Sequence, residues 1–359
     1  MENRPYFSII MPVYNAEKYI YGIINNIKKQ TFEDWELIIV NDCSMDNSGE
    51  ICQKYAEKDK RILLINLEQN EGAGYARNRG IEQARGEYIT FVDADDEIEP
   101  DLYKKVWMQT NKYNVDVVCW GLVEEYFDKK ETLQSENRIS LSTARCKNSK
   151  EVIKKVIELE EKTLFGYQWN KVYKADIIKT YNVRFEKAIL YEDYFFNLDV
   201  IKHTNSMIII DECLYHYKKR VNESITNKFV DEYYSLSYRR VESMYELYKE
   251  KGLLTSNVKC KLRRILLRYT LSALMRNCDP QAKMNYKERK KWIKENSKKE
   301  MYHALRMPKR EKALFGLLEI FLEKNMYTGC LLMGRGMYIA KQGIPMVYLA
   351  LKKTRGNNK

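Results

Sequence analysis

Four carboxylates gather within five positions at the end of a short apolar run. The run, Tyr88–Val92, is β-branched and aromatic, as a buried strand should be, and it is followed by Asp93, Asp95, Asp96 and Glu97. Crowded carboxylates repel one another unless a cation lies between them, and hard oxygen ligands suit Mn2+ or Mg2+. Asp93 and Asp95 form a D-x-D pair, and their spacing alone fits a metal site and a solvated acidic loop equally well.

A second pair of carboxylates, Glu192 and Asp193, lies at the expected start of a helix within Ile189–His203. The helix macrodipole stabilises an anion there by about 0.3 to 1 kcal/mol when exposed, which favours a simple capping pair. Partial burial beside the phenylalanines of the same helix would have the opposite effect. It would raise the carboxyl pKa toward that of a general base.

Strands and helices alternate in the part of the chain that must position these groups. Asn15 follows the first strand and is expected to cap the next helix. Alternating elements with short connections predict a mainly parallel, Rossmann-like sheet, whose carboxyl edge is where ligands bind. The expected strands are Phe7–Val13, Glu36–Val40, Ile62–Ile65 and Tyr88–Val92, with helices near 20–30, 51–56 and 75–85.

The loops after these strands carry the side chains expected of a nucleotide pocket. Tyr14 is placed to stack on a base, Asp42 to accept from its ring N–H, and Arg77 to approach a diphosphate. The alternatives are that Tyr14 is a packing residue and that Arg77 pairs with Glu71 or Glu82. The chain has neither G-x-G-x-x-G after its first strand nor G-x-x-x-x-G-K-[ST], so a dinucleotide fold and a P-loop are not supported.

The next hundred residues are less regular. Trp169 is either a platform for a sugar or a buried core residue. A basic turn at 218–220, Lys-Lys-Arg, is expected either to reach phosphates or to be solvated. The expected elements are a helix at 101–113, a strand at 115–122, a loop-rich region with one strand at 128–149, a helix at 150–159, and short strands at 207–210 and 213–217.

Composition predicts a globular protein of two domains. The chain has 359 residues, of which 45% are hydrophobic, and a formal net charge of +12. The charge is uneven: residues 1–120 carry −7, residues 121–220 carry +2 and residues 221–359 carry +17. The acidic residues 1–120 are therefore predicted to form a catalytic unit that recruits a cation. The basic residues 221–359 are predicted to contact an anionic partner.

Cysteine usage and hydropathy predict a cytoplasmic protein. The eight cysteines include no C-x-x-C pair and are expected to be reduced thiols. The three histidines have no metal-ligand spacing. The apolar run Phe7–Val13 is too short for a secretory segment, and no run of about twenty apolar residues is present to span a membrane.

The basic C-terminal region is expected to be mainly helical. Basic helices with aromatics beside an apolar helix suit the anionic inner face of a membrane, where a lipid-diphosphate-linked acceptor would be reached. Solvated helices around a small core, or a homodimer interface, are the alternatives. The expected helices are 233–251, 258–276, 286–299 and 312–323, and the segment 327–351 is interrupted by glycines and charges.

Taken together, five segments resemble the family 2 glycosyltransferases, and most closely the bacterial polysaccharide-assembly members. The resemblance covers about residues 6–225. The segments are FSIIMPVYN at 7–15, VNDCSMDNS at 40–48, NEGAGYARNRG at 70–80, FVDADD at 91–96 and YED at 191–193.

This resemblance implies a GT-A fold, an α/β fold with a mostly parallel sheet flanked by helices. It implies an inverting transfer from a nucleotide-diphospho-sugar, most often UDP-linked, to a glycan or lipid-linked glycan. The domain boundaries are then 1–225 for the GT-A unit and 226–359 for the helical region. By motif match, Pro12, Tyr14 and Asp42 would hold the base with Asn15 and Arg77 nearby, Asp93 the ribose side, Asp95 the Mn2+ or Mg2+, and Asp193 would be the base with Glu192 beside it.

One position departs from the family pattern, and two rival functions stay open. Cys43 stands where the N-D-G-S turn has glycine, so a positive backbone angle there would be costly. One rival is a sugar-phosphate nucleotidyltransferase, although no glycine-rich, lysine-bearing segment follows the first strand. The other is a non-enzymatic nucleic-acid-binding protein that uses the C-terminal charge, which leaves the acidic turn and Asp193 without a purpose.

Overall fold

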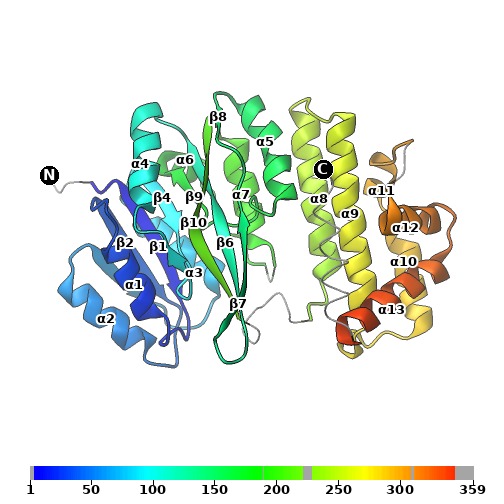
Figure 1. Cartoon of the computed structure of the whole chain (residues 1–359), viewed down its shortest axis with the longest axis horizontal. Coiled ribbons are helices and arrows are strands. Elements are labelled where there is room, and N and C mark those ends of the chain that lie inside the picture. Colours follow the sequence, from blue (N-terminus) through cyan, green and yellow to red (C-terminus); the bar gives the residue numbers. More distant parts are fainter. Residues whose placement is uncertain (1–3, 189, 221–228, 309–310, 344–359) are drawn as a thin grey trace. The chain divides into compact units, whose positions relative to one another are not determined.

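The structure, a computed structural model, describes residues 4–188, 190–220, 229–308 and 311–343. The chain forms two compact units, Met1–Ser224 and Ile225–Lys359 (Figure 1). The first unit is built on a β-sheet and the second on helices.

A ten-stranded sheet forms the centre of the first unit. Its strand order is β3-β2-β1-β4-β9-β6-β10-β5, with β7 paired to β6 and β8 to β10. The strands are β1 (Phe7–Val13), β2 (Trp35–Asn41), β3 (Ile62–Asn66), β4 (Tyr88–Phe91), β5 (Glu97–Ile98), β6 (Val117–Phe127), β7 (Leu133–Ile139), β8 (Ala144–Cys146), β9 (Lys171–Lys174) and β10 (Met207–Arg220). Strands β1 to β4 are mutually parallel, as expected.

Seven helices accompany the sheet in the described part of this unit. They are α1 (Ile20–Lys28), α2 (Ser48–Lys58), α3 (Ala73–Gln83), α4 (Leu102–Tyr113), α5 (Ser149–Glu161), α6 (Ala175–Thr180) and α7 (Glu192–Lys202). Helix α3 packs on β1 and β2. Its Gly80 allows this close approach, because a Cβ atom there would lie 2.4 Å from Cγ2 of Ile10. That contact fixes Arg77, one turn earlier, near the carboxyl ends of the strands.

The second half of the sheet departs from the sequence prediction. Strand β9 and helix α6 were not predicted, and β9 runs antiparallel to both β4 and β6. The two short strands expected at 207–210 and 213–217 are one strand, β10, with a register shift between Ile210 and Tyr215. The prediction of a basic turn at residues 218–220 is therefore wrong, because these residues continue β10 beside β6. The region 128–149 also holds two strands, β7 and β8, where one was expected.

The second unit is helical. Its elements are α8 (Tyr233–Glu250), α9 (Ser256–Arg276), the 3-10 helix η2 (Pro280–Ala282), α10 (Tyr286–Asn296), α11 (Glu300–Ala304), α12 (Ala313–Glu323) and α13 (Tyr327–Gly343). Helices α8 and α9 lie side by side (Figure 1), and α9 also contacts α12 and α13. Leu271, Leu274, Ile293 and Leu318 are at the core of this unit. None of the helices in the described ranges is long and apolar enough to cross a membrane.

Candidate active site

The acidic turn after β4 contains carboxylates in three different environments. Asp96 is buried, and its Oδ atoms accept from the Tyr215 hydroxyl (2.8 Å) and the Lys218 backbone N–H (2.9 Å). Burial raises the pKa of Asp96 well above its ordinary value, and the charges of Asp95 and Asp93 raise it further. Because the Tyr215 hydroxyl also accepts from the Asp93 backbone N–H (3.1 Å), it ties the turn to β10.

Asp95, the predicted metal ligand, is the most exposed of the three aspartates Asp93, Asp95 and Asp96. Its Oδ2 lies 3.1 Å from Nη1 of Arg220, and the guanidinium also donates to the Asp95 carbonyl oxygen. The same guanidinium lies 4.0 Å from the centre of the Tyr19 ring. Each side chain of the expected basic turn has a carboxylate partner, which contradicts the solvated alternative. Lys218 pairs with Glu97 and Lys219 with Glu124.

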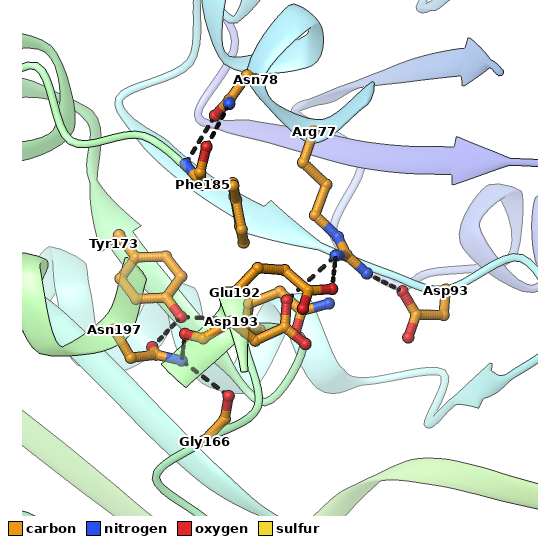
Figure 2. Close-up of polar contacts among 10 residues, drawn as sticks. Arg77, Asn78, Asp93, Gly166, Tyr173, Phe185, Glu192, Asp193 and Asn197 are labelled. Carbon is orange, nitrogen blue, oxygen red and sulfur yellow. Dashed lines mark hydrogen bonds and ion pairs between the residues drawn. The ribbon is translucent and has the colours of Figure 1, made fainter. Parts of the chain in front are cut away.

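Arg77 joins the two carboxylate groups that the sequence singled out. Its side chain is buried, with 4% of the residue exposed. Nη2 lies 2.9 Å from Oδ1 of Asp93, and Nη1 lies 3.1 Å from Oδ1 of Asp193 and 3.9 Å from Oε1 of Glu192. Figure 2 shows the guanidinium of Arg77 reaching Asp93 on one side and the α7 carboxylates on the other. The acidic turn and the start of α7 therefore form one cluster.

The alternative partners proposed for Arg77 are wrong. Glu71 pairs with Lys187, and Glu82 pairs with Arg79 on the exposed side of α3. The predicted contact of Arg77 with a diphosphate stays a prediction. Its contacts with three carboxylates favour a role as their counter-cation.

Asp193, the predicted base, lies partly buried in the first turn of α7. Burial raises its pKa to about 8, although the Arg77 guanidinium opposes the shift, and the carboxylates of Glu192 and Asp93 add to it. The pKa of Glu192 is also raised, again by burial. Neither residue is the N-cap of α7. That position is Tyr191, with φ of 67° and no side-chain cap, but both carboxylates lie in the first turn of α7, as predicted.

The helix that carries Asp193 is fixed by a polar contact and by aromatic packing. Asn197 donates to the Asp193 carbonyl oxygen (2.8 Å) and accepts from the Tyr173 hydroxyl (2.7 Å). Phe185 stacks on Phe196 with ring centres 4.0 Å apart. These contacts hold the first turn of α7 against the sheet (Figure 2).

The loops after β1 and β2 carry the residues that were predicted to hold the nucleotide. Both oxygens of the buried Asp42 carboxylate accept backbone N–H groups, from Glu71 and from Gly72, each at 2.8 Å. Asp42 therefore shapes the loop before α3, and its predicted contact with a base stays a prediction. Tyr14 has 50% of its surface exposed, so its ring is accessible for stacking, and Pro12 lies half-buried in β1.

Two loop residues adopt left-handed backbone conformations. Asn15 has φ of 49° and accepts from the Met45 backbone N–H (2.8 Å). Its predicted capping role is wrong, because α1 begins at Ile20 after the N-cap Tyr19. Cys43 has φ of 57°, so the strain that its departure from glycine predicted is present and costs about 1 to 2 kcal/mol.

Gln168 was not among the predicted site residues, and Arg220 was predicted only as part of the basic turn at 218–220. The neighbouring Trp169 matches one of its two predicted roles. Trp169 is buried, 4.1 Å from the Tyr215 ring and 4.4 Å from the Tyr167 ring, so the core interpretation is confirmed. Gln168 is fully buried between Arg77 and Asp193. Its only signal in the sequence is a weak one, a polar side chain between the two aromatic residues Tyr167 and Trp169.

The oxygen donors of the acidic turn fit a hard divalent cation. Asp95 already faces a cationic group, Arg220, and burial, followed by the charges of Asp95 and Asp93, raises the pKa of Asp96. The described residues contain no group of three His, Cys, Asp or Glu side chains able to hold a metal.

This site lies at the carboxyl edge of the parallel strands β1 to β4 within a mixed sheet, the edge at which α/β folds bind their ligands. Comparisons with known proteins define the class. The model of glycosyl transferase family 2 matches residues 8–181. The uncharacterized glycosyltransferase EpsJ of Bacillus subtilis (strain 168) is 30% identical over 279 residues, which cover 76% of this chain and 78% of EpsJ. The chain therefore belongs to glycosyltransferase family 2.

Other similarities agree with this assignment. Glycosyltransferase GlyA of Streptococcus pneumoniae serotype 4 (strain ATCC BAA-334 / TIGR4) is 32% identical over 216 residues, covering 59% of this chain but only 30% of GlyA. The crystal structure of S. aureus TarS 1–349 in complex with UDP-GlcNAc matches with a TM-score of 0.64 at 22% identity. That match covers 94% of this chain and 92% of TarS 1–349, and it confirms the GT-A fold.

Proposed function

We propose that this glycosyltransferase moves a sugar, with inversion, from a UDP-sugar to a hydroxyl of a glycan or lipid-linked glycan in cell-surface polysaccharide synthesis. The observation that carries the proposal is the Arg77 bridge between Asp93 and Asp193. It brings the predicted donor side and the predicted base into one cluster. The UDP-GlcNAc complex of TarS supports a UDP-linked donor.

Inverting transfer needs one in-line displacement and one base. The acceptor oxygen attacks the anomeric carbon, its proton passes to the Asp193 carboxylate, and the bond between that carbon and the diphosphate oxygen breaks. Arg77 holds the Asp193 carboxylate in place through the 3.1 Å contact. Because burial raises the pKa of Asp193, its deprotonated side chain is a stronger proton acceptor than that of an ordinary aspartate.

Asp95 would hold the divalent cation, Mn2+ or Mg2+. When bound, such a cation neutralises charge that develops on the leaving diphosphate. Arg220, which pairs with Asp95 in this structure, would then have to give up or share that carboxylate. Tyr14, Pro12 and Asp42 would lie at the base of the nucleotide and Asp93 at its ribose.

Asp95→Ala is expected to remove the Mn2+-dependent part of UDP binding. UDP at about a hundred times its Kd should stabilise the wild-type protein by about 2.7 kcal/mol, which thermal unfolding detects. In the variant, adding Mn2+ with UDP should raise the Tm no more than UDP alone. Glu97→Ala is the matched control, because Glu97 lies in the same turn but pairs with Lys218. An unchanged Mn2+ effect in Asp95→Ala would contradict the ligand role.

Exposed apolar side chains on α13 favour a second proposal, peripheral attachment to an anionic membrane at its cytoplasmic face. Leu332 is 65% exposed and Ile339, two helical turns later, is 59% exposed. The exposed Arg335 lies between them on the same face, and the neighbouring α10 carries exposed lysines at 287, 290, 291 and 294. Exposed apolar groups beside a basic one on α13, with further lysines on the neighbouring α10, match the boundary of an anionic bilayer, at about 1 kcal/mol per basic residue near the surface.

Vesicle flotation tests this attachment. The full chain is expected to float with anionic vesicles at low salt and to stay at the bottom with neutral vesicles. Replacing Leu332 and Ile339 together by glutamate should abolish flotation, whereas Met45→Glu, an exposed position of the first unit, should not. Wild-type protein that stays in the bottom fraction with anionic vesicles would refute the proposal.

A further inference from the structure

The side chain of Gln168 is buried between the two charged groups on which the proposed mechanism depends. The residue is 0% exposed. One orientation of its amide satisfies both neighbours. In it, the amide nitrogen donates to Oδ2 of Asp193 at 2.9 Å, and the amide oxygen accepts from Nη2 of Arg77 at 2.8 Å. Gln168 therefore joins the guanidinium to the carboxylate a second time, beside their direct contact.

Buried hydrogen bonds from Lys171 and Asn170 hold the loop that carries Gln168. The buried Lys171 donates from Nζ to the carbonyl oxygens of Leu164 (3.0 Å), Phe165 (3.1 Å) and Tyr167. Asn170 donates to the carbonyl oxygens of Leu164 and Trp120, each at 3.1 Å. These bonds fix the loop before β9, so the amide of Gln168 has little freedom to turn away.

Aromatic stacking of Trp169 also holds this loop. Trp169 stacks on Tyr215, whose hydroxyl holds Asp96 and the Asp93 backbone N–H. Gln168 and Trp169 therefore brace the two carboxylate groups from adjacent positions. A loop with only a packing role would not need a polar side chain at its buried position.

We propose that Gln168 is a positioning residue for sugar transfer, which orients the Asp193 carboxylate through its amide N–H and holds Arg77 through its amide oxygen. The inference rests on the proposed base role of Asp193. It adds a residue that acts through Asp193 and Arg77 without touching either substrate. Its predicted effect is on the charged form of Asp193, because a carboxylate that accepts a hydrogen bond is stabilised as the anion.

Four charged groups face Asp193 in addition to the neutral amide of Gln168, and each of them keeps its ion-pair or hydrogen-bond partners when only position 168 changes. They are Arg77 on α3, Asp93 after β4, Lys171 on β9 and Glu192 on α7. Loss of the amide N–H removes stabilisation of the anion only. The pKa of Asp193 should therefore rise, and the acid limb of activity should move to higher pH.

The test is the titration of Asp193 in the full chain, followed by NMR of isotopically labelled aspartate carboxyl carbons. Asp193→Asn identifies the signal. Gln168→Met keeps a similar volume without polar atoms, and it should raise the pKa of Asp193 by about one unit, the effect of one hydrogen bond to a charged group. Gln168→Glu keeps the shape but places a second carboxylate there, so the rise should be larger.

Kinetics with a nucleotide sugar give the second readout. In Gln168→Met, kcat should fall about tenfold with the donor KM near wild type, and the acid limb should move up with the titration. Gln53→Met is the matched control, because the exposed Gln53 also donates to a carboxylate, that of Glu57, but on α2. An unchanged pKa of Asp193 in the folded variants overturns the inference. Because the titration needs no turnover, this result is distinct from a failure of the proposed function.

Discussion

Asp193→Asn is expected to fold and to bind UDP while losing about 10²- to 10⁴-fold in the rate of sugar transfer. The amide has the size of the carboxylate but cannot take a proton from the acceptor hydroxyl. The Arg77 guanidinium keeps Asp93 and Glu192 as partners, so the cluster retains two of its three ion pairs. Folding is checked by thermal unfolding, binding by the shift that UDP produces, and transfer by UDP release.

Asp199→Asn is the matched control for this variant. Asp199 lies on the same helix, α7, but it is exposed and pairs with Lys202. Surface pairs of this kind contribute about 0 to 1 kcal/mol, so activity and stability should stay near wild type. Normal turnover by Asp193→Asn would remove the base assignment, whereas equal losses in both variants would point to a general effect on α7.

Arg77→Met should have the largest effect on stability. The substitution leaves the partly buried carboxylates of Asp93, Glu192 and Asp193 without their shared cation, which costs up to about 3 kcal/mol, the lower end of the range for a broken buried pair. The Asp193 carboxyl should then titrate at higher pH, because the charge that opposed its raised pKa is gone. Activity near neutral pH should be lost together with stability. Denaturant unfolding measures the first effect, and UDP release measures the second.

Arg79→Met separates this effect from a loss of charge on α3. Arg79 is two positions along the same helix, exposed, and paired with Glu82. Its replacement should change stability by no more than about 0.5 kcal/mol. Arg77→Lys should not restore the wild-type protein, because an ammonium group cannot make the forked contacts of a guanidinium with two carboxylates at once. A stability loss in Arg77→Met no larger than in Arg79→Met would contradict the bridging role.

Much of the first half of the fold could be predicted because its signals are local. Strand β1 and helix α4 were placed within one residue of their observed bounds, since an apolar strand and a helical repeat each show within a few positions. Strand β9 could not be predicted, since its four residues include two lysines. Lys171 is buried only because carbonyl oxygens from the preceding loop surround its ammonium group, and that arrangement exists only in the folded chain.

The residues of the site, too, could be predicted only where their signals are local in the sequence. The acidic turn and the α7 carboxylates were found from residue types and their place after a strand or at the start of a helix. Their connection could not be found, because Arg77 reaches its partners across 16 and 116 positions of the chain. Gln168 carries no motif of its own, and its importance comes only from the two charged groups that meet it.

In the proposed mechanism, one base and one displacement transfer the sugar from a UDP-linked donor. The most direct measurement is NMR of the glycosidic product formed from a UDP-sugar by the wild-type protein, which gives the anomeric configuration of the new bond. We expect UDP release together with a configuration opposite to that of the donor. A product that retains the donor configuration would contradict the mechanism, because retention requires chemistry that a single base at Asp193 does not provide.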